Sequence, residues 1–124
     1  MVEGKTCLIT GASDGIGKET AFSLAKQGAK VIIVGRNQKK CEKVVSEIIQ
    51  LTQNNQIEFL LADLSLMREV NSLAERIMYG YRHLDILINN VGAFFRKREL
   101  TEEGLERTFA LNHLSYFLLT HKLL

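Results

Sequence analysis

The sequence has no proline, no tryptophan, only two cysteines, and no apolar run approaching the ~20 residues of a membrane span. An expected strand stands near the N-terminus, where a secretory signal would need an apolar core after basic residues. The two cysteines, Cys7 and Cys41, lack the spacing of a metal site, which favours reduced, packed thiols. These absences predict a cytoplasmic protein with no membrane span and no metal.

Charge of one sign is also scarce, because 16 Lys and Arg against 14 Asp and Glu give a net charge of +2. This balance is too small to predict binding to nucleic acid or to an acidic membrane surface. The basic cluster Arg96-Lys97-Arg98 is followed by Glu99 and predicts a solvated loop. Without repeats or low-complexity linkers, residues 1–124 are expected to form part of a single domain, with no second domain.

Short apolar runs alternate with amphipathic stretches along the whole chain. Strands are expected near residues 5–10, 30–35, 57–62 and 84–89, and their continuous apolar character is typical of a parallel sheet covered on both faces. The intervening segments place apolar residues at helical spacing, with Asn37 and Thr101 as expected N-caps. The pattern predicts an α/β fold, a doubly wound Rossmann-type parallel sheet with strand order 3-2-1-4 and a cofactor crevice between the first and fourth strands.

A glycine-rich turn joins the first expected strand to the first helix, in the segment Thr10-Gly11-Ala12-Ser13-Asp14-Gly15-Ile16-Gly17. Free N–H groups and the helix dipole at such a junction favour a bound pyrophosphate. Gly11 permits the sharp turn, Gly15 leaves room for a phosphate, and Gly17 lets the helix pack on the strands. The spacing differs from the common G-x-G-x-x-G fingerprint, so the turn predicts nucleotide binding, with a purely structural turn as the alternative.

With Thr10 in front, this loop resembles the T-G-x-x-x-G-x-G cofactor loop of the short-chain dehydrogenase/reductase family. Later segments fall where the resemblance places them: Asp63-Leu64, Asn89-Asn90-Val91-Gly92 and Asn112. Val91 departs from the family's N-N-A-G motif. The resemblance implies an adenine contact at Asp63 and a catalytic role for Asn112, whereas the structural alternatives are a helix-cap region with Ser65 as the cap and a buried amide that pins helix to sheet. The cofactor residues that it implies are Gly11, Ser13, Asp14, Gly15, Ile16, Gly17, Arg36, Asn37, Asp63, Leu64, Asn90, Val91 and Gly92.

The family's catalytic Ser and Tyr-x-x-x-Lys pair have no counterpart in the sequence. The resemblance therefore covers the N-terminal half of a family domain and implies an oxidoreductase that interconverts an alcohol and a carbonyl, with this chain alone inactive. The segment from Phe94 to Leu124 is most similar to the retinol-dehydrogenase-like branch, which implies a lipophilic substrate. The alternative is a truncated, non-catalytic nucleotide-binding or partner-binding form, whereas a methyltransferase would not explain the later motifs.

The end of the second strand predicts the cofactor. NAD enzymes place a carboxylate there against the ribose 2′-hydroxyl, but this chain has Gly35-Arg36-Asn37. Arg36 can hold a phosphate through two hydrogen bonds, and Lys39 and Lys40 add positive charge nearby. NADP is therefore expected over NAD, although the acidic Asp14 in the glycine loop argues the other way.

Apolar residues surround the last expected helix. One stripe contains Asn112 among apolar neighbours and is expected to be buried against the sheet, and a second stripe lies opposite. The first stripe comprises Leu105, Phe109, Asn112, Tyr116, Leu119 and Leu123, and the second comprises Ala110, Leu111, Leu114, Phe117 and Leu118. The second stripe is expected to meet a surface that this part of the chain does not supply. The family resemblance implies that this surface is the same helix of a partner subunit, and hence a homo-oligomer of the full-length protein; the alternative is a core helix of the same chain.

Overall fold

The computed structural model describes residues 2–92 and 97–124, arranged in two compact units. Unit 1 comprises Met1–Leu61 and His83–Asn90, and unit 2 comprises Ala62–Arg82 and Val91–Leu124. Phe94 and Arg96, used in the sequence analysis, lie outside the described residues.

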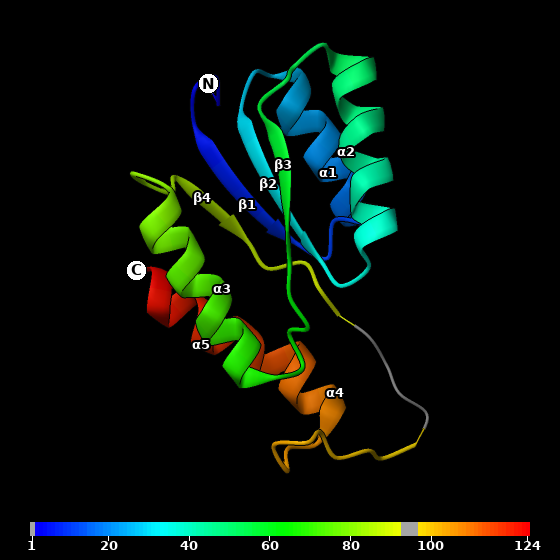
Figure 1. The fold of residues 1–124 in the computed structure, drawn as a ribbon, viewed down its shortest axis with the longest axis vertical. Helices are drawn as coiled ribbons and strands as arrows, with labels where there is room; N and C mark the ends of the chain where they lie inside the picture. The colour runs from blue at the N-terminus through cyan, green and yellow to red at the C-terminus, as the bar shows by residue number, and fades with distance from the viewer. Residues whose placement is uncertain (1, 93–96) are drawn as a thin grey trace. The chain divides into compact units, whose positions relative to one another are not determined.

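Unit 1 contains a four-stranded parallel sheet in the order β3-β2-β1-β4 (Figure 1), which confirms the predicted topology. Its strands are β1 (Thr6–Thr10), β2 (Lys30–Gly35), β3 (Ile57–Leu61) and β4 (Ile86–Ile88). All four match the predicted runs to within two residues at each end. The agreement follows from the apolar character of these short runs, which is a local property of the sequence.

Helices α1 (Gly15–Lys26) and α2 (Gln38–Thr52) cover one face of this sheet (Figure 1). Side chains alternate along a strand, so every second residue of β1 and β2 meets these helices. The resulting core comprises Cys7, Ile9, Ala12, Ala21, Ala25, Ala29, Val31, Ile33, Cys41, Val44, Ile48 and Ile57. Burying each large aliphatic side chain stabilises the fold by roughly 1.5–3 kcal/mol, and this core fixes where the strands end.

Unit 2 is helical, with α3 (Met67–Gly80) packed beside α5 (Ser115–Leu123) (Figure 1). The predicted amphipathic character of α3 is confirmed, because its buried residues follow helical spacing at Val70, Leu73, Ala74 and Ile77. Before α5 come the short helix α4 (Arg107–Phe109) and a π-helical turn, η1 (Ala110–Leu114).

The π-helical turn makes the predicted division of the last helix into two stripes wrong. Buried positions occur at Ala110, Ser115 and Leu119, with a step of five residues across the turn followed by a step of four. A π turn adds one residue to a helical turn. An assignment of residues to faces that assumes 100° per residue is therefore wrong for the residues after the turn. Asn112, predicted to be buried, is exposed within this turn.

The predicted cap at Thr101 is also wrong, and the structural alternative that made Ser65 a cap does not hold. Thr101 begins no helix, because Gly104 adopts a left-handed backbone (φ +79°) and the side chain of Glu106 caps α4 instead. Ser65 does not cap α3, since its hydroxyl donates to Asp63 at 2.7 Å. The carboxylate of Glu103 accepts hydrogen bonds from the N–H groups of Met67 and Arg68 at the start of α3. A cap supplied from so far along the chain leaves no local pattern in the sequence.

Candidate cofactor site

The glycine loop of unit 1 uses its three glycines for different purposes. Gly11 and Gly15 have left-handed backbones, with φ of +66° and +56°, which glycine adopts without strain. A Cβ atom built on Gly15 would meet nothing within 4 Å, so the loop surface is open there. A Cβ atom on Gly17 would lie 2.3 Å from the carbonyl oxygen of Gly11 and 2.5 Å from Nδ2 of Asn90. Only glycine permits this close packing of α1 against the loop.

The first turn of α1 has no side-chain cap. Asp14 occupies the N-cap position with an extended backbone, but its carboxylate makes no capping hydrogen bond. The N–H groups of the first turn therefore keep the partial positive charge that attracts anions to helix N-termini. Ile16 lies in this turn with its side chain 77% exposed, so this end of the helix is accessible from solvent.

Asn90 connects the glycine loop to the end of β4. Its backbone N–H donates to Oγ1 of Thr10 at 2.9 Å, and its side-chain amide donates to the carbonyl of Gly11 at 3.2 Å. The N–H of Gly11 in turn donates to Val34 of β2 at 3.0 Å. These bonds bring together the C-terminal ends of β1, β2 and β4, where doubly wound sheets bind their ligands.

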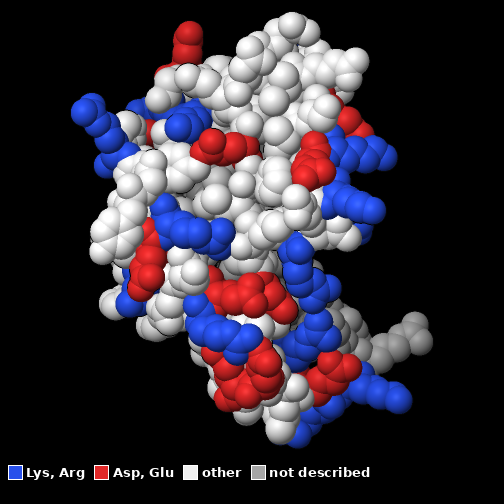
Figure 2. Space-filling model, in the orientation of Figure 1, with Lys and Arg blue, Asp and Glu red and all other residues white. Residues whose placement is uncertain are grey.

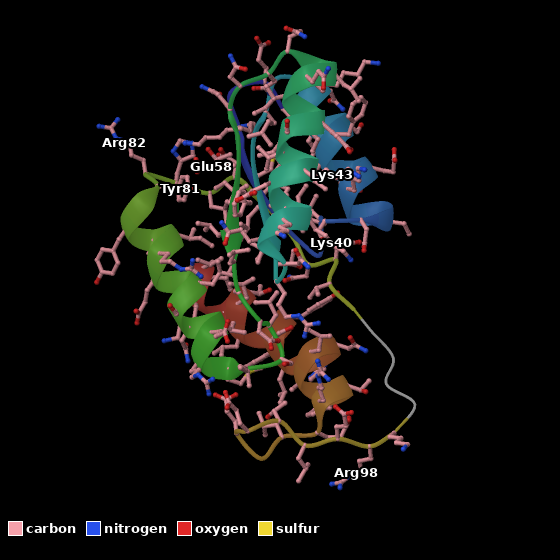
Figure 3. The ribbon with its side chains drawn as sticks, turned by 45° about the vertical axis from the view of Figure 1, so that its right-hand side comes forward. Lys40, Lys43, Glu58, Tyr81, Arg82 and Arg98 are labelled. Atoms are coloured by element: carbon pink, nitrogen blue, oxygen red, sulfur yellow. The ribbon has the colours of Figure 1, made fainter. Side chains whose placement is uncertain are left out.

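The end of β2 carries positive charge beside the loop. Arg36 is exposed, and Asn37 caps α2 as predicted, accepting from the N–H of Lys40 at 3.1 Å. Nζ of Lys40 lies 4.0 Å from a carboxylate oxygen of Asp14. Figure 3 shows Lys40 near the N-terminal end of α2, with Lys43 further along the same helix. The pair between Lys40 and Asp14 offsets the negative charge that argued against NADP.

Asp63, in unit 2, organises the turn before α3. One of its carboxylate oxygens accepts from the N–H of Ser65 at 3.0 Å and from its hydroxyl, while the N–H of Asp63 donates to Glu69 at 2.7 Å. Leu64 beside it is buried at 4% exposure. The geometry holds Asp63 in a fixed position by side-chain bonds to its own turn.

Unit 2 also places Gly92 and Asn112 together. A Cβ atom on Gly92 would lie 3.6 Å from Oδ1 of Asn112, which is an ordinary van der Waals contact. Next to it, the hydroxyl of Tyr116 donates a hydrogen bond to the carbonyl of Val91, and partial burial raises the pKa of Tyr116. Tyr116 thus fixes the backbone before Gly92, a role that sequence reasoning missed because nothing local pairs residues so far apart.

The short chain dehydrogenase family profile matches residues 5–124. Retinol dehydrogenase 12 of Mus musculus is 44% identical over 124 residues, covering 100% of this chain and 39% of that protein. Retinol dehydrogenase 13 of Homo sapiens is 39% identical over 99% of this chain and 37% of its own length. A solved structure from Escherichia coli CFT073, complexed with NADPH, superimposes with a TM-score of 0.81 at 32% identity over 98% of this chain and 52% of that one.

The chain belongs to the short-chain dehydrogenase family.

The resemblance to the retinol-dehydrogenase-like branch is confirmed by these relatives. The chain spans about two-fifths of the length of the curated relatives that it matches, with 37% and 39% of the two proteins covered. The strand order 3-2-1-4 that was predicted for this short-chain dehydrogenase sequence is also the order that the structure shows.

Across the part of the chain that the structure describes, no three His, Cys, Asp or Glu side chains cluster as metal ligands would. Within the same residues, no helix has the length and apolar character that crossing a bilayer requires. Cys7 and Cys41 are both free and buried, as predicted. Figure 2 shows acidic and basic side chains interspersed on one face.

Proposed function

We propose that the protein acts as an NADP-dependent oxidoreductase that interconverts a lipophilic alcohol and its carbonyl compound. The single observation that carries this proposal is the glycine loop of unit 1, where Gly15 leaves open space before the uncapped N-terminus of α1. Such a junction binds a pyrophosphate by backbone N–H groups and helix dipole. The family membership, the NADPH complex of a structural relative and the retinol dehydrogenase names of curated relatives support it.

Each part of the cofactor has proposed contacts in unit 1. The loop residues Gly11, Ser13, Asp14, Gly15, Ile16 and Gly17 hold the pyrophosphate, and Asn90 keeps the loop against the sheet. Arg36, with Asn37 and Lys40 beside it, binds the 2′-phosphate through a charge-assisted hydrogen bond. NADP, when bound, supplies or accepts the hydride; the residues of this chain bind and orient it.

The family pattern extends the proposal to residues of unit 2. Asp63 and Leu64 contact the adenine, Val91 and Gly92 form part of the cofactor floor, and Asn112 takes the family's catalytic role. The structure supports the last assignment through the contact between Gly92 and Asn112 and through the exposure of Asn112. Since the sequence contains no Tyr-x-x-x-Lys, we expect the 124-residue chain to show no reductase activity by itself.

Cofactor titration tests the proposal. The protein should bind NADPH more tightly than NADH, and Arg36→Leu should remove most of the difference, since a charge-assisted phosphate contact contributes about 1.5–3 kcal/mol. That loss corresponds to a roughly 10- to 150-fold weaker Kd for NADPH, with little change for NADH. The measurement is the Kd of each cofactor by fluorescence titration.

Arg82→Leu is the matched control, because it removes the same charge from an exposed position after α3 (Figure 3). NADPH binding should be unchanged in this variant. Equal Kd values for the two cofactors in the unmodified protein, or equal losses in the two variants, would contradict the assignment of Arg36.

We also propose that the protein assembles with a second copy of itself and acts on a small molecule rather than on nucleic acid. Exposed apolar side chains on the last helical segment, including Phe109 at 50% and Phe117 at 65% exposure, support the assembly. The cytoplasmic location stays a prediction.

A further inference from the structure

We infer that the Cys41 thiol helps to determine cofactor choice, because it restricts the residue that can stand at the end of β2. This inference rests on the proposed NADP-dependent function. Gly35 is the last residue of β2, the place where NAD-selective proteins carry the carboxylate that binds the ribose hydroxyls. The absence of an acid there has so far been only a fact of the sequence. The structure supplies a physical reason for it.

A side chain at position 35 would collide with Cys41. A Cβ atom built on Gly35 would lie 2.6 Å from Sγ of Cys41, closer than any real Cβ contact, and 3.6 Å from Cβ of Ser13. The backbone of Gly35 has no positive φ, so glycine is required here by space and not by backbone conformation. The first atom of an aspartate or glutamate side chain therefore already needs the thiol to move.

Cys41 has little room to move. It is fully buried, at 0% exposure, and belongs to the core cluster that also contains Val44 and Ile48 of the same helix. Helical backbone also disfavours one of the three χ1 rotamers of a side chain. Close-packed cores respond to an added carbon by straining several neighbours at once. The thiol thus excludes an acid from position 35. Arg36 is then the residue that distinguishes the cofactors, by binding the 2′-phosphate on the ribose.

Cys41 is a specificity-determining residue without any contact to the cofactor of its own. The sequence gives no sign of this effect, since a buried cysteine at a helical core position is ordinary. Changing only position 35 should therefore fail to convert the site, whereas changing positions 35 and 41 together should succeed.

A double-mutant cycle tests this coupling with Gly35→Asp, Cys41→Ala and the combined variant. Two readouts are needed: the thermal midpoint Tm without cofactor, and the Kd values of NADPH and NADH. Gly35→Asp alone should lower Tm and weaken both cofactors, and Cys41→Ala alone should keep the preference for NADPH. The combined variant should regain Tm relative to Gly35→Asp. It should also shift the ratio of Kd values toward NADH by about tenfold or more, as expected for one charge-assisted contact.

Cys7→Ala is the matched control, because Cys7 is the other free, fully buried cysteine of the same core. Combining it with Gly35→Asp should rescue neither Tm nor NADH binding. If Gly35→Asp fails to fold, Gly35→Ala replaces it and tests the steric part alone, with the same rescue of Tm by Cys41→Ala expected.

The outcomes separate the two proposals. If the unmodified protein binds neither cofactor, the proposed function is contradicted. The role of Cys41 in cofactor choice is then contradicted as well. Normal NADPH binding combined with additive effects of the two substitutions overturns only the role of Cys41. Tight NADH binding by Gly35→Asp alone, at an unchanged Tm, has the same meaning, because the thiol would then have moved aside freely.

Discussion

At the scale of single residues, the glycines of the loop and the glycine at the end of β2 serve different physical purposes. Gly17 is required by close packing, Gly15 by its backbone angle and open surroundings, and Gly35 by the thiol beside it. The sequence predicted the first two from spacing alone, because a strand, a glycine turn and a helix occur consecutively. It could not predict the third, because the contact with Cys41 depends on how α2 packs on the sheet.

Gly15→Val should abolish cofactor binding while the fold survives. The substitution places a branched side chain where the backbone must approach a pyrophosphate, so we expect the Kd to rise by orders of magnitude. A non-glycine residue in left-handed backbone also costs about 1–2 kcal/mol of stability. Titration with NADPH measures the first effect, and thermal unfolding measures the second.

Gly4→Val separates strain from binding. Gly4 also has a left-handed backbone (φ +75°), and its Cβ position is also open, so its substitution should lower stability by a similar amount. Cofactor affinity should stay unchanged in this control. A folded Gly15→Val variant with normal affinity would reduce Gly15 to a turn residue.

At the scale of elements, the strands and the start of α2 were predictable, whereas the starts of α3 and α4 were not. Each strand is a short apolar run that can be recognised from neighbouring residues alone. Asn37 likewise caps a helix that begins at the next residue. The caps of α3 and α4 come from Glu103 and Glu106, which the turn at Gly104 brings into position. The wrong prediction that Asn112 is buried has a similar origin, because packing and not sequence periodicity determines where a π turn forms.

Asp85 makes the attachment of β4 dependent on pH. Its carboxylate accepts from the N–H of Thr6 at 2.8 Å and lies 3.1 Å from Nε2 of His83. The hydrogen bond from Thr6, followed by the charges of His83 and Lys5, lowers the pKa of Asp85. A carboxyl whose pKa is lower in the folded state stabilises the fold above its unfolded pKa of about 3.9 and loses that contribution as the pH falls.

Asp85→Asn should therefore flatten the acid side of the stability profile. The free energy of unfolding, measured by urea titration between about pH 6 and 3, should fall less steeply than in the unmodified protein. Glu75→Gln, which removes an exposed carboxyl from α3, should keep the original slope. Identical slopes for Asp85→Asn and the unmodified protein would show that this carboxylate is irrelevant to acid stability.

At the scale of the whole molecule, self-association is the main prediction. Phe109 stacks on His113 and Phe117 on His121, with centroid separations of 5.1 Å and 6.0 Å, so the last helical segment carries two pairs of stacked rings. Burying such a surface against a second copy would be favourable. Light scattering at micromolar concentration should detect a dimer or a larger species.

Phe117→Glu should shift the protein toward the monomer, since a charge buried in an apolar interface is costly. Tyr79→Glu is the control, because Tyr79 is an exposed aromatic residue of α3 at 90% exposure, and its substitution should leave the mass unchanged. A monomeric unmodified protein, or equal effects of the two variants, would contradict assembly through this segment.

The position of β1 in the sheet has a consequence for biosynthesis. Leu8 of β1 lies opposite Ile32 of β2 on one side and opposite Leu87 of β4 on the other. A ribosome makes β1 first, so β2 is available soon afterwards, whereas β4 emerges only after α2, β3 and α3. During that interval one row of backbone N–H and C=O groups on the central strand has no strand to pair with, and an unpaired strand edge invites contact with other nascent chains. Among these four strands, β1 thus keeps one open edge until β4 has been made.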